Sequence, residues 1–104
     1  MVEHITEEEW VEQIKKDPES IILDVRTQEE VDESRLDYTK HIDIRDEDSF
    51  LDEVENLDRS KNYYIYCRSG ARSAKACEIM DEMGFKNTYN LLGGIINWTG
   101  PVKK

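Results

Sequence analysis

The chain has 104 residues, enough for one hydrophobic core and too few for two, so we predict a single domain over residues 1–104. Its net charge of −10 argues against binding to nucleic acid or to anionic membranes, because both need a basic face that displaces counterions from phosphates. No apolar run approaches the roughly 18 residues that span a bilayer, and two cysteines are too few for a disulfide-rich secreted scaffold. We therefore expect a cytoplasmic protein with reduced thiols.

The charge is unevenly distributed along the chain. Residues 1–66 contain 8 basic and 21 acidic side chains, whereas residues 67–104 contain 6 and 3. Most of the acids are expected on a solvated surface that keeps the protein in solution. A locally positive site in an acidic background favours a small anionic ligand over a large polyanion.

Two capping boxes mark the first two helices. Thr6-Glu-Glu-Glu9 predicts a helix over about 7–16, which cannot continue through Pro18. Thr27-Gln-Glu-Glu30 predicts a second, short helix that ends near Ser34.

An apolar run lies between these helices. Ile21-Ile-Leu23 predicts a buried parallel strand with Asp24 at its carboxyl end, which is where α/β sheets place ligands. The Asp24 carboxylate either orients the neighbouring loop and its arginines or serves a local turn, and both roles stay open. For Arg26 we favour an ion pair with Glu29 or Glu30 over contact with a substrate.

The middle of the chain is less informative. His41-Ile-Asp-Ile44 predicts a small strand, and an acidic helix is expected from Asp46 to Leu57. We expect His41 to have a surface or edge role, since it has no evident carboxylate or cysteine partner. No pair of histidines or cysteines has the close spacing of a zinc site, so we predict neither a metal nor a cofactor.

The last third of the chain contains two strand patterns and one helix pattern. The expected elements are a strand over Tyr63–Tyr66, a helix over about 72–83 that ends at Gly84, a strand over Thr88–Leu91, and a turn at Gly93-Gly94 before Ile95, Ile96 and Trp98 close the core. The order β-α-β-α-(β)-α-β-α-β predicts an α/β fold with a small, mainly parallel central sheet of about five strands and helices on both faces.

The segment from Cys67 to Arg72 is the candidate active-site loop. A thiol between a strand and a helix lies beside unpaired helical N–H groups, and Gly70 allows the loop to turn these groups inward as an anion-binding nest. Arg68 and Arg72 add positive charge, while Ser69 and Ala71 complete the loop. Together these groups are expected to lower the thiol pKa below its free value of about 8.5.

The two cysteines have different expected roles. Cys67 is read as the reactive thiol, although an unpaired cysteine is often only a small buried side chain. Cys77 lies on one helix face with Ser73 and Met80, so we favour core packing over a role as resolving thiol.

Three motifs resemble those of the rhodanese family of sulfurtransferases. Cys67-Arg-Ser-Gly-Ala-Arg-Ser73 is similar to its active-site loop, Leu23-Asp-Val-Arg26 with Glu29 and Glu30 to its early Asp-Val-Arg segment, and Leu92-Gly-Gly-Ile-Ile-Asn-Trp98 to its closing Gly-Gly…Trp motif. The resemblance covers about residues 5–98. The stretch from Ser34 to Asp43 departs from the family's Gly-His-Ile-Pro-Gly-Ala pattern.

The resemblance implies a three-layer rhodanese-like domain that moves a sulfane sulfur from a donor such as thiosulfate to cyanide or a thiol, through a persulfide on Cys67. The expected partners are a small anionic donor and a thiol or cyanide acceptor, with a protein thiol as a further acceptor. Two alternatives stay open: a non-catalytic binding or regulatory module, and a cysteine-dependent phosphatase or arsenate reductase. The phosphatase alternative is disfavoured because four residues rather than five separate Cys67 from Arg72, and no aspartate follows in the general-acid position.

Overall fold

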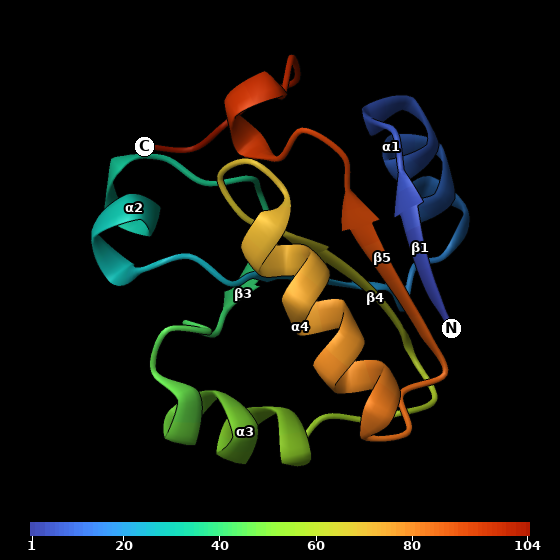
Figure 1. Cartoon of the computed structure of the whole chain (residues 1–104). Helices are drawn as coiled ribbons and strands as arrows, with labels where there is room; N and C mark the ends of the chain where they lie inside the picture. The colour runs from blue at the N-terminus through green and yellow to red at the C-terminus, as the bar shows by residue number, and fades with distance from the viewer.

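A computed structural model describes residues 1–104. Strands and helices alternate along the chain, as Figure 1 shows. In chain order the elements are β1 (Val2–Ile5), α1 (Glu7–Lys16), β2 (Ile21–Asp24), α2 (Gln28–Glu33), β3 (Thr39–His41), α3 (Glu47–Glu55), β4 (Asn62–Tyr66), α4 (Ala71–Glu82), β5 (Asn87–Leu91) and a 3-10 turn (Ile95–Asn97).

All five strands are parallel and are arranged in the order β1-β5-β4-β2-β3. Strand β4 lies at the centre, with Tyr66 paired in register with Asp24 of β2. The carboxyl ends of these two central strands therefore lie next to each other. The loop that follows β4 and the loop that follows β2 share this edge of the sheet.

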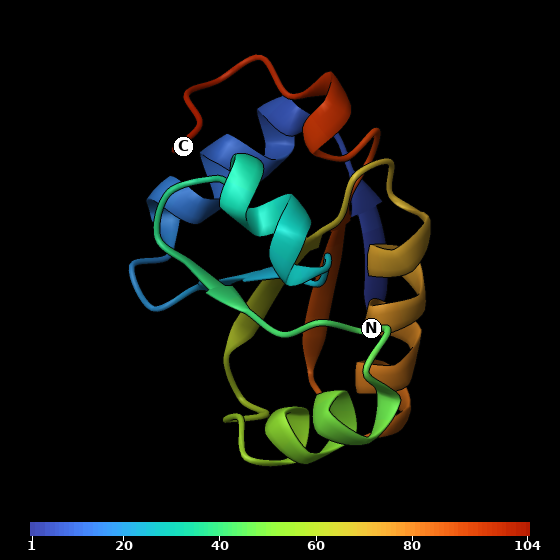
Figure 2. The same cartoon turned by 90° about the vertical axis from the view of Figure 1, so that its left-hand side faces the viewer.

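The central strand is apolar on both faces, as expected for a strand covered from both sides. Tyr63 and Ile65 belong to the core cluster that includes residues of α3 and α4, whereas Tyr64 and Tyr66 pack with Trp10 of α1 in a second cluster. Figures 1 and 2 show α3 and α4 on one face of the sheet and α1 on the other. The prediction of a mainly parallel α/β sheet with helices on both faces is confirmed.

Both capping boxes form as the sequence predicts. The side chains of Thr6 and Thr27 accept hydrogen bonds from the N–H groups of Glu9 and Glu30, whose carboxylates bond back to the cap residues. These reciprocal bonds satisfy N–H groups that a helix cannot pair internally, and so they fix where α1 and α2 begin.

Two local predictions were wrong. The third strand runs over Thr39–His41 rather than 41–44, because Ile42 and Ile44 instead donate backbone hydrogen bonds to Asp24 and Val25 as the chain leaves the sheet edge. Ile96 does not close the core but is 57% exposed, since the 3-10 turn points it away from the sheet.

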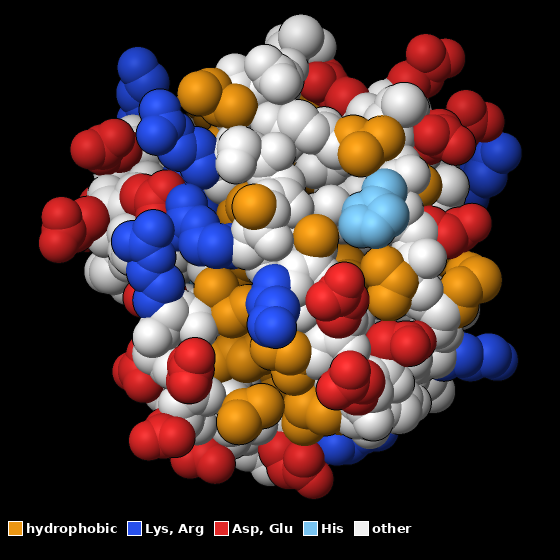
Figure 3. Space-filling model, viewed as in Figure 1, with side chains coloured by type: hydrophobic (Ala, Val, Ile, Leu, Met, Phe, Trp, Pro, Cys, Tyr) orange, Lys and Arg blue, Asp and Glu red, His pale blue; other side chains and the backbone are white.

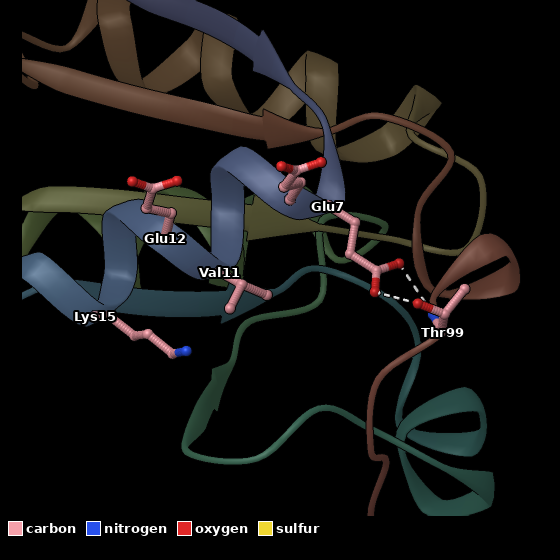
Figure 4. Close-up of a pocket in the computed structure, with 6 residues that line it drawn as sticks. Glu7, Val11, Glu12, Lys15 and Thr99 are labelled. Atoms are coloured by element: carbon pink, nitrogen blue, oxygen red, sulfur yellow. Dashed lines mark hydrogen bonds between the residues drawn. The ribbon is translucent and has the colours of Figure 1, made fainter.

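The segment after the 3-10 turn is tied to α1. Thr99 donates from its N–H and its hydroxyl to the Glu7 carboxylate, at 2.9 and 2.6 Å (Figure 4). The surface hollow beside this contact is lined by Glu8, Glu12 and Lys15 and contains no cysteine. No helix of the structure is long and apolar enough to cross a membrane.

Candidate active site

The Cys67 sulfur lies at the carboxyl end of β4, inside the loop that leads into α4. Gly70 donates its N–H to Sγ at 3.0 Å, and the Ser73 hydroxyl lies 3.4 Å from the same atom. Gly70 can point its N–H inward because it adopts φ 108°, in the left-handed region that favours glycine. The sulfur therefore accepts hydrogen bonds from the loop and from the first turn of α4.

These hydrogen bonds favour the thiolate. Burial raises the pKa of Cys67, but hydrogen bonds from the Ser73 hydroxyl and from the N–H groups of Ser73, Gly70 and Ser69 outweigh it, so the pKa lies below that of an ordinary thiol. The N–H donors belong to Ser69 and Gly70 of the loop and to Ser73 of the first turn of α4. A hydrogen-bonded thiolate needs no histidine base.

Ser73 and Asn90 are site residues that the sequence analysis missed. The Ser73 hydroxyl contacts Asn90 Oδ1 as well as the sulfur, while Asn90 Nδ2 donates to the Gly70 carbonyl at 3.3 Å and lies 2.9 Å from His4 Nδ1. Asn90 thereby holds both the loop and the serine from the neighbouring strand. Only the packing of α4 against β5 brings these residues together, and a spacing pattern within one element cannot reveal it.

Replacing Ser73 with alanine is expected to raise the pKa of Cys67, because the change removes a hydroxyl hydrogen bond that favours the thiolate. The hydroxyl has one hydrogen and contacts both Sγ and Asn90 Oδ1, so the experiment also shows which of the two it serves. The ultraviolet absorbance of the thiolate as a function of pH measures the change. Ser69→Ala is the matched control, because it keeps the backbone N–H that faces the sulfur. An unchanged pKa in Ser73→Ala would show that the hydroxyl serves only Asn90.

The 3-10 turn holds the outer side of the loop. Ile95 and Ile96 donate their N–H groups to the carbonyls of Cys67 and Arg68, both at 3.0 Å. Gly94 packs so tightly here that an added Cβ would lie 2.3 Å from the Arg68 carbonyl oxygen. Because these carbonyls are bound on the outside, the amides of the loop are free to face the sulfur.

Arg72 braces the loop against α2. Its guanidinium makes two parallel hydrogen bonds to the Glu30 carboxylate, at 2.7 and 2.9 Å. The hydrogen bonds from Arg72 lower the pKa of Glu30 to about 2, and those same bonds, with a smaller contribution from the Cys67 thiolate, raise the pKa of Arg72. Arg72 therefore acts on the site as a structural cation.

Arg68 and Cys67 differ in their access to solvent. Arg68 is exposed, takes part in no ion pair of the chain, and lines a cleft beside the loop. Cys67 is only 1% exposed, so an incoming group must reach the sulfur through the loop. The buried sulfur is therefore reached more readily by a small terminal atom of a ligand than by a central atom that carries bulky substituents.

Asp24 and Arg26 form a buried cluster beneath the site. The Asp24 carboxylate accepts three hydrogen bonds from the Arg26 guanidinium, at 2.7, 3.0 and 3.1 Å, and one from the Tyr66 hydroxyl at 2.7 Å. It also accepts the Arg26 N–H at 3.0 Å, so the turn role and the arginine-orienting role coincide. The predicted ion pair of Arg26 with Glu29 or Glu30 is wrong, because Asp24 binds the Arg26 guanidinium and Glu30 contacts it only through its backbone carbonyl.

Cys77 and His41 have structural surroundings. Cys77 is fully buried, and burial raises its pKa to about 12. Both cysteines are free. The His41 Nε2 lies 2.6 Å from the Arg26 carbonyl, which fastens β3 to the loop after β2. No group of three or more histidine, cysteine or acidic side chains is arranged to hold a metal ion.

The fold and the position of the thiol together define a class of α/β domains with a cysteine loop at the carboxyl end of the central parallel strand. Within that class, the family model of the rhodanese-like domain matches residues 7–101. The chain belongs to the rhodanese-like family.

Similar proteins agree with this assignment. "Putative sulfurtransferase YtwF" of Bacillus subtilis is 41% identical over 92 residues, which cover 88% of this chain and 85% of that protein. The tRNA uridine(34) hydroxylase of Pelagibacter ubique is 30% identical over 101 residues, or 97% of this chain and 33% of that protein. The crystal structure of a rhodanese-related protein from Thermoplasma volcanium has a TM-score of 0.82 at 28% identity and covers 97% of both chains.

Proposed function

We propose that this protein is a sulfurtransferase that carries a sulfane sulfur on Cys67 as a persulfide. The observation that supports this proposal is the set of donors around Sγ, which stabilise an anion at that position without a basic side chain. The family supports a transferase of sulfur.

In the first step, the Cys67 thiolate attacks the outer sulfur of a donor such as thiosulfate. The bond from Cys67 to that sulfur forms, the sulfur–sulfur bond of thiosulfate breaks, and sulfite leaves with the electron pair. The terminal sulfur of the persulfide stays within reach of the loop N–H groups. A small outer sulfur suits a site whose thiol is only 1% exposed.

In the second step, an acceptor removes the outer sulfur. Cyanide attacks the outer sulfur and is released as thiocyanate. A thiolate attacks the outer sulfur of the protonated persulfide and is released as a new persulfide. Both reactions restore the Cys67 thiolate. Arg68 attracts the anionic donor at the cleft, and Arg72 holds the loop through Glu30. Neither step needs an oxidant or a cofactor.

Two observations disfavour the alternatives. A phosphatase would use the arginine of the loop to bind the oxyanion, but both guanidinium nitrogens of Arg72 that face Glu30 are already occupied. A non-catalytic module would have no need for hydrogen bonds that lower the pKa of a thiol. The resemblance to tRNA hydroxylases covers a third of those proteins, and a net charge of −10 does not favour tRNA as a ligand of this chain.

Mass spectrometry tests the proposal directly. After incubation with excess thiosulfate, the reduced protein is expected to gain the mass of one sulfur atom on Cys67, and dithiothreitol is expected to remove it. A Cys77→Ala variant should gain the same mass. A folded protein that gains no sulfur would favour the binding module.

Because both thiols are free, we also expect this domain, over residues 1–104, to work in the reducing cytoplasm.

A further inference from the structure

A large cleft lies beside the Cys67 loop, between α2, the loop and the C-terminal segment. Its volume is about 730 Å³. Clefts of about 300–1,000 Å³ hold ligands of drug-like size, whereas thiosulfate is much smaller. The cleft is therefore larger than the donor requires.

The cleft contains unpaired charges of both signs. Glu29 and Glu33 line it from α2, and Arg45 and Arg68 line it from the two loops that follow β3 and β4. None of these four side chains takes part in an ion pair within the chain. Figure 3 shows acidic and basic side chains intermixed on the left of this face, over α2 and the C-terminal end.

Apolar side chains form another wall of the cleft. Ile96 is 57% exposed and Val102 is 42% exposed, and both line the cleft together with Trp98. The Trp98 indole donates its N–H to the Pro101 carbonyl at 3.1 Å, which fixes the ring. A ligand can therefore bury hydrocarbon next to the charged groups.

The charges discriminate between ligand classes. A dianion such as thiosulfate is attracted by the pair of arginines, Arg45 and Arg68, but repelled by the nearby pair of glutamates. The effects of the two pairs on its binding therefore oppose each other. A neutral thiol uses neither pair. A ligand with a carboxylate at one end and an ammonium at the other satisfies both pairs at once.

We propose that this cleft binds a small zwitterionic, peptide-like thiol, and that this thiol is the acceptor of the second step. The inference rests on the proposed function. Carboxylates of the acceptor contact Arg45 and Arg68, its ammonium contacts Glu29 and Glu33, and its thiolate attacks the outer sulfur of the protonated Cys67 persulfide. The sulfur–sulfur bond at Cys67 breaks, the Cys67 thiolate is restored, and the acceptor leaves as a protonated persulfide.

A single-turnover experiment tests the charge preference. The protein is loaded with sulfur from thiosulfate, freed of donor, and mixed with glutathione, N-acetylglutathione, glutathione diethyl ester or 2-mercaptoethanol. Rates are expressed per concentration of thiolate, because the thiols ionise differently. Glutathione is expected to react about fivefold faster than N-acetylglutathione, which lacks the ammonium, and about fivefold faster than the diester, which lacks the carboxylates.

Charge-neutralised variants assign each preference to its residues. Glu29→Gln with Glu33→Gln is expected to remove the preference over N-acetylglutathione only, and Arg45→Gln is expected to reduce the preference over the diester only. Asp32→Asn is the matched control, since Asp32 is an exposed acid of α2 that does not line the cleft. Each rate is divided by the cyanide rate of the same variant, so that a less reactive persulfide is not mistaken for weaker binding of the acceptor.

The outcomes separate the two proposals. Loading with sulfur followed by equal rates for all four thiols would overturn the zwitterion site and leave sulfur transfer intact. A glutathione preference that survives the double glutamate variant would also overturn it. Failure of the protein to load with sulfur would overturn the proposed function itself, and the acceptor site with it.

Discussion

Replacing Cys67 with alanine is expected to lower the rate of sulfur transfer from thiosulfate to cyanide by at least about 10³-fold. The proposed intermediate is covalent, so removal of its sulfur leaves no group that can hold the transferred atom. Removal of a covalent nucleophile commonly costs rate factors of this size or larger. Thiocyanate formation, measured over time with purified protein, is the readout.

Cys77→Ala is the control for this experiment. Cys77 is fully buried in the core and its pKa is raised to about 12, so it does not supply a thiolate near neutral pH. Its loss is expected to leave the rate within about threefold of the original, because the change removes one buried atom away from the loop. Substantial turnover by Cys67→Ala would rule out the persulfide mechanism. Loss of turnover in Cys77→Ala alone would show that the reaction takes place on Cys77 and not on Cys67.

Replacing Asp24 with alanine is expected to reduce the free energy of unfolding by about 3–5 kcal/mol. The change leaves the Arg26 guanidinium without its counter-ion, although the Arg26 side chain is only 4% exposed. Breaking a buried ion pair by removing one partner reduces stability by about this amount. Burial alone would lower the pKa of Arg26, but Asp24 holds it above its ordinary value, so the arginine stays charged in the native protein. Urea unfolding followed by circular dichroism measures the loss.

A double variant separates the pair from its surroundings. Asp24→Ala combined with Arg26→Met removes both charges, so the combined loss is expected to be smaller than the sum of the single losses by about 1–3 kcal/mol. Lys16→Met gives the exposed comparison, because Lys16 pairs with Glu12 at the surface and its loss should change stability by at most about 0.5 kcal/mol. A loss below about 1 kcal/mol in Asp24→Ala would mean that water already solvates Arg26.

Much of the fold could be predicted because its signals are local. The hydroxyl of Thr6 and the carboxylate of Glu9 lie one helical turn apart, so a four-residue pattern is enough to fix the start of α1. The apolar run at Tyr63–Tyr66 likewise contains its own evidence for a strand covered on both faces. The position of Cys67 could be predicted from these elements, because a loop that connects a buried parallel strand to the next helix must lie at the carboxyl end of that strand.

The remaining features depend on pairs that are distant in sequence. Glu30 had two arginines within reach, and only the packing of α2 against the loop decides that its carboxylate binds Arg72, 42 residues away, and leaves Arg26 to Asp24. The contact of Ser73 with Asn90 requires the packing of α4 against β5, which the sequence does not encode as a spacing. Ile96 was misplaced for the same reason, because its apolar side chain is compatible with a core or with the wall of a cleft.

The bonds from Ile95 and Ile96 to the carbonyls of Cys67 and Arg68 have a consequence for biosynthesis. During translation the chain emerges with its amino end first, so β4 and α4 leave the ribosome before the turn that fastens the loop. Until Gly94 has settled against Arg68, the carbonyls of Cys67 and Arg68 lack these partners, and we expect the pKa of the nascent thiol to lie closer to that of an ordinary thiol. The reactivity proposed for Cys67 is therefore expected to develop only after nearly all of the domain has been synthesised, and we expect the unfinished polypeptide to be less sensitive to oxidation.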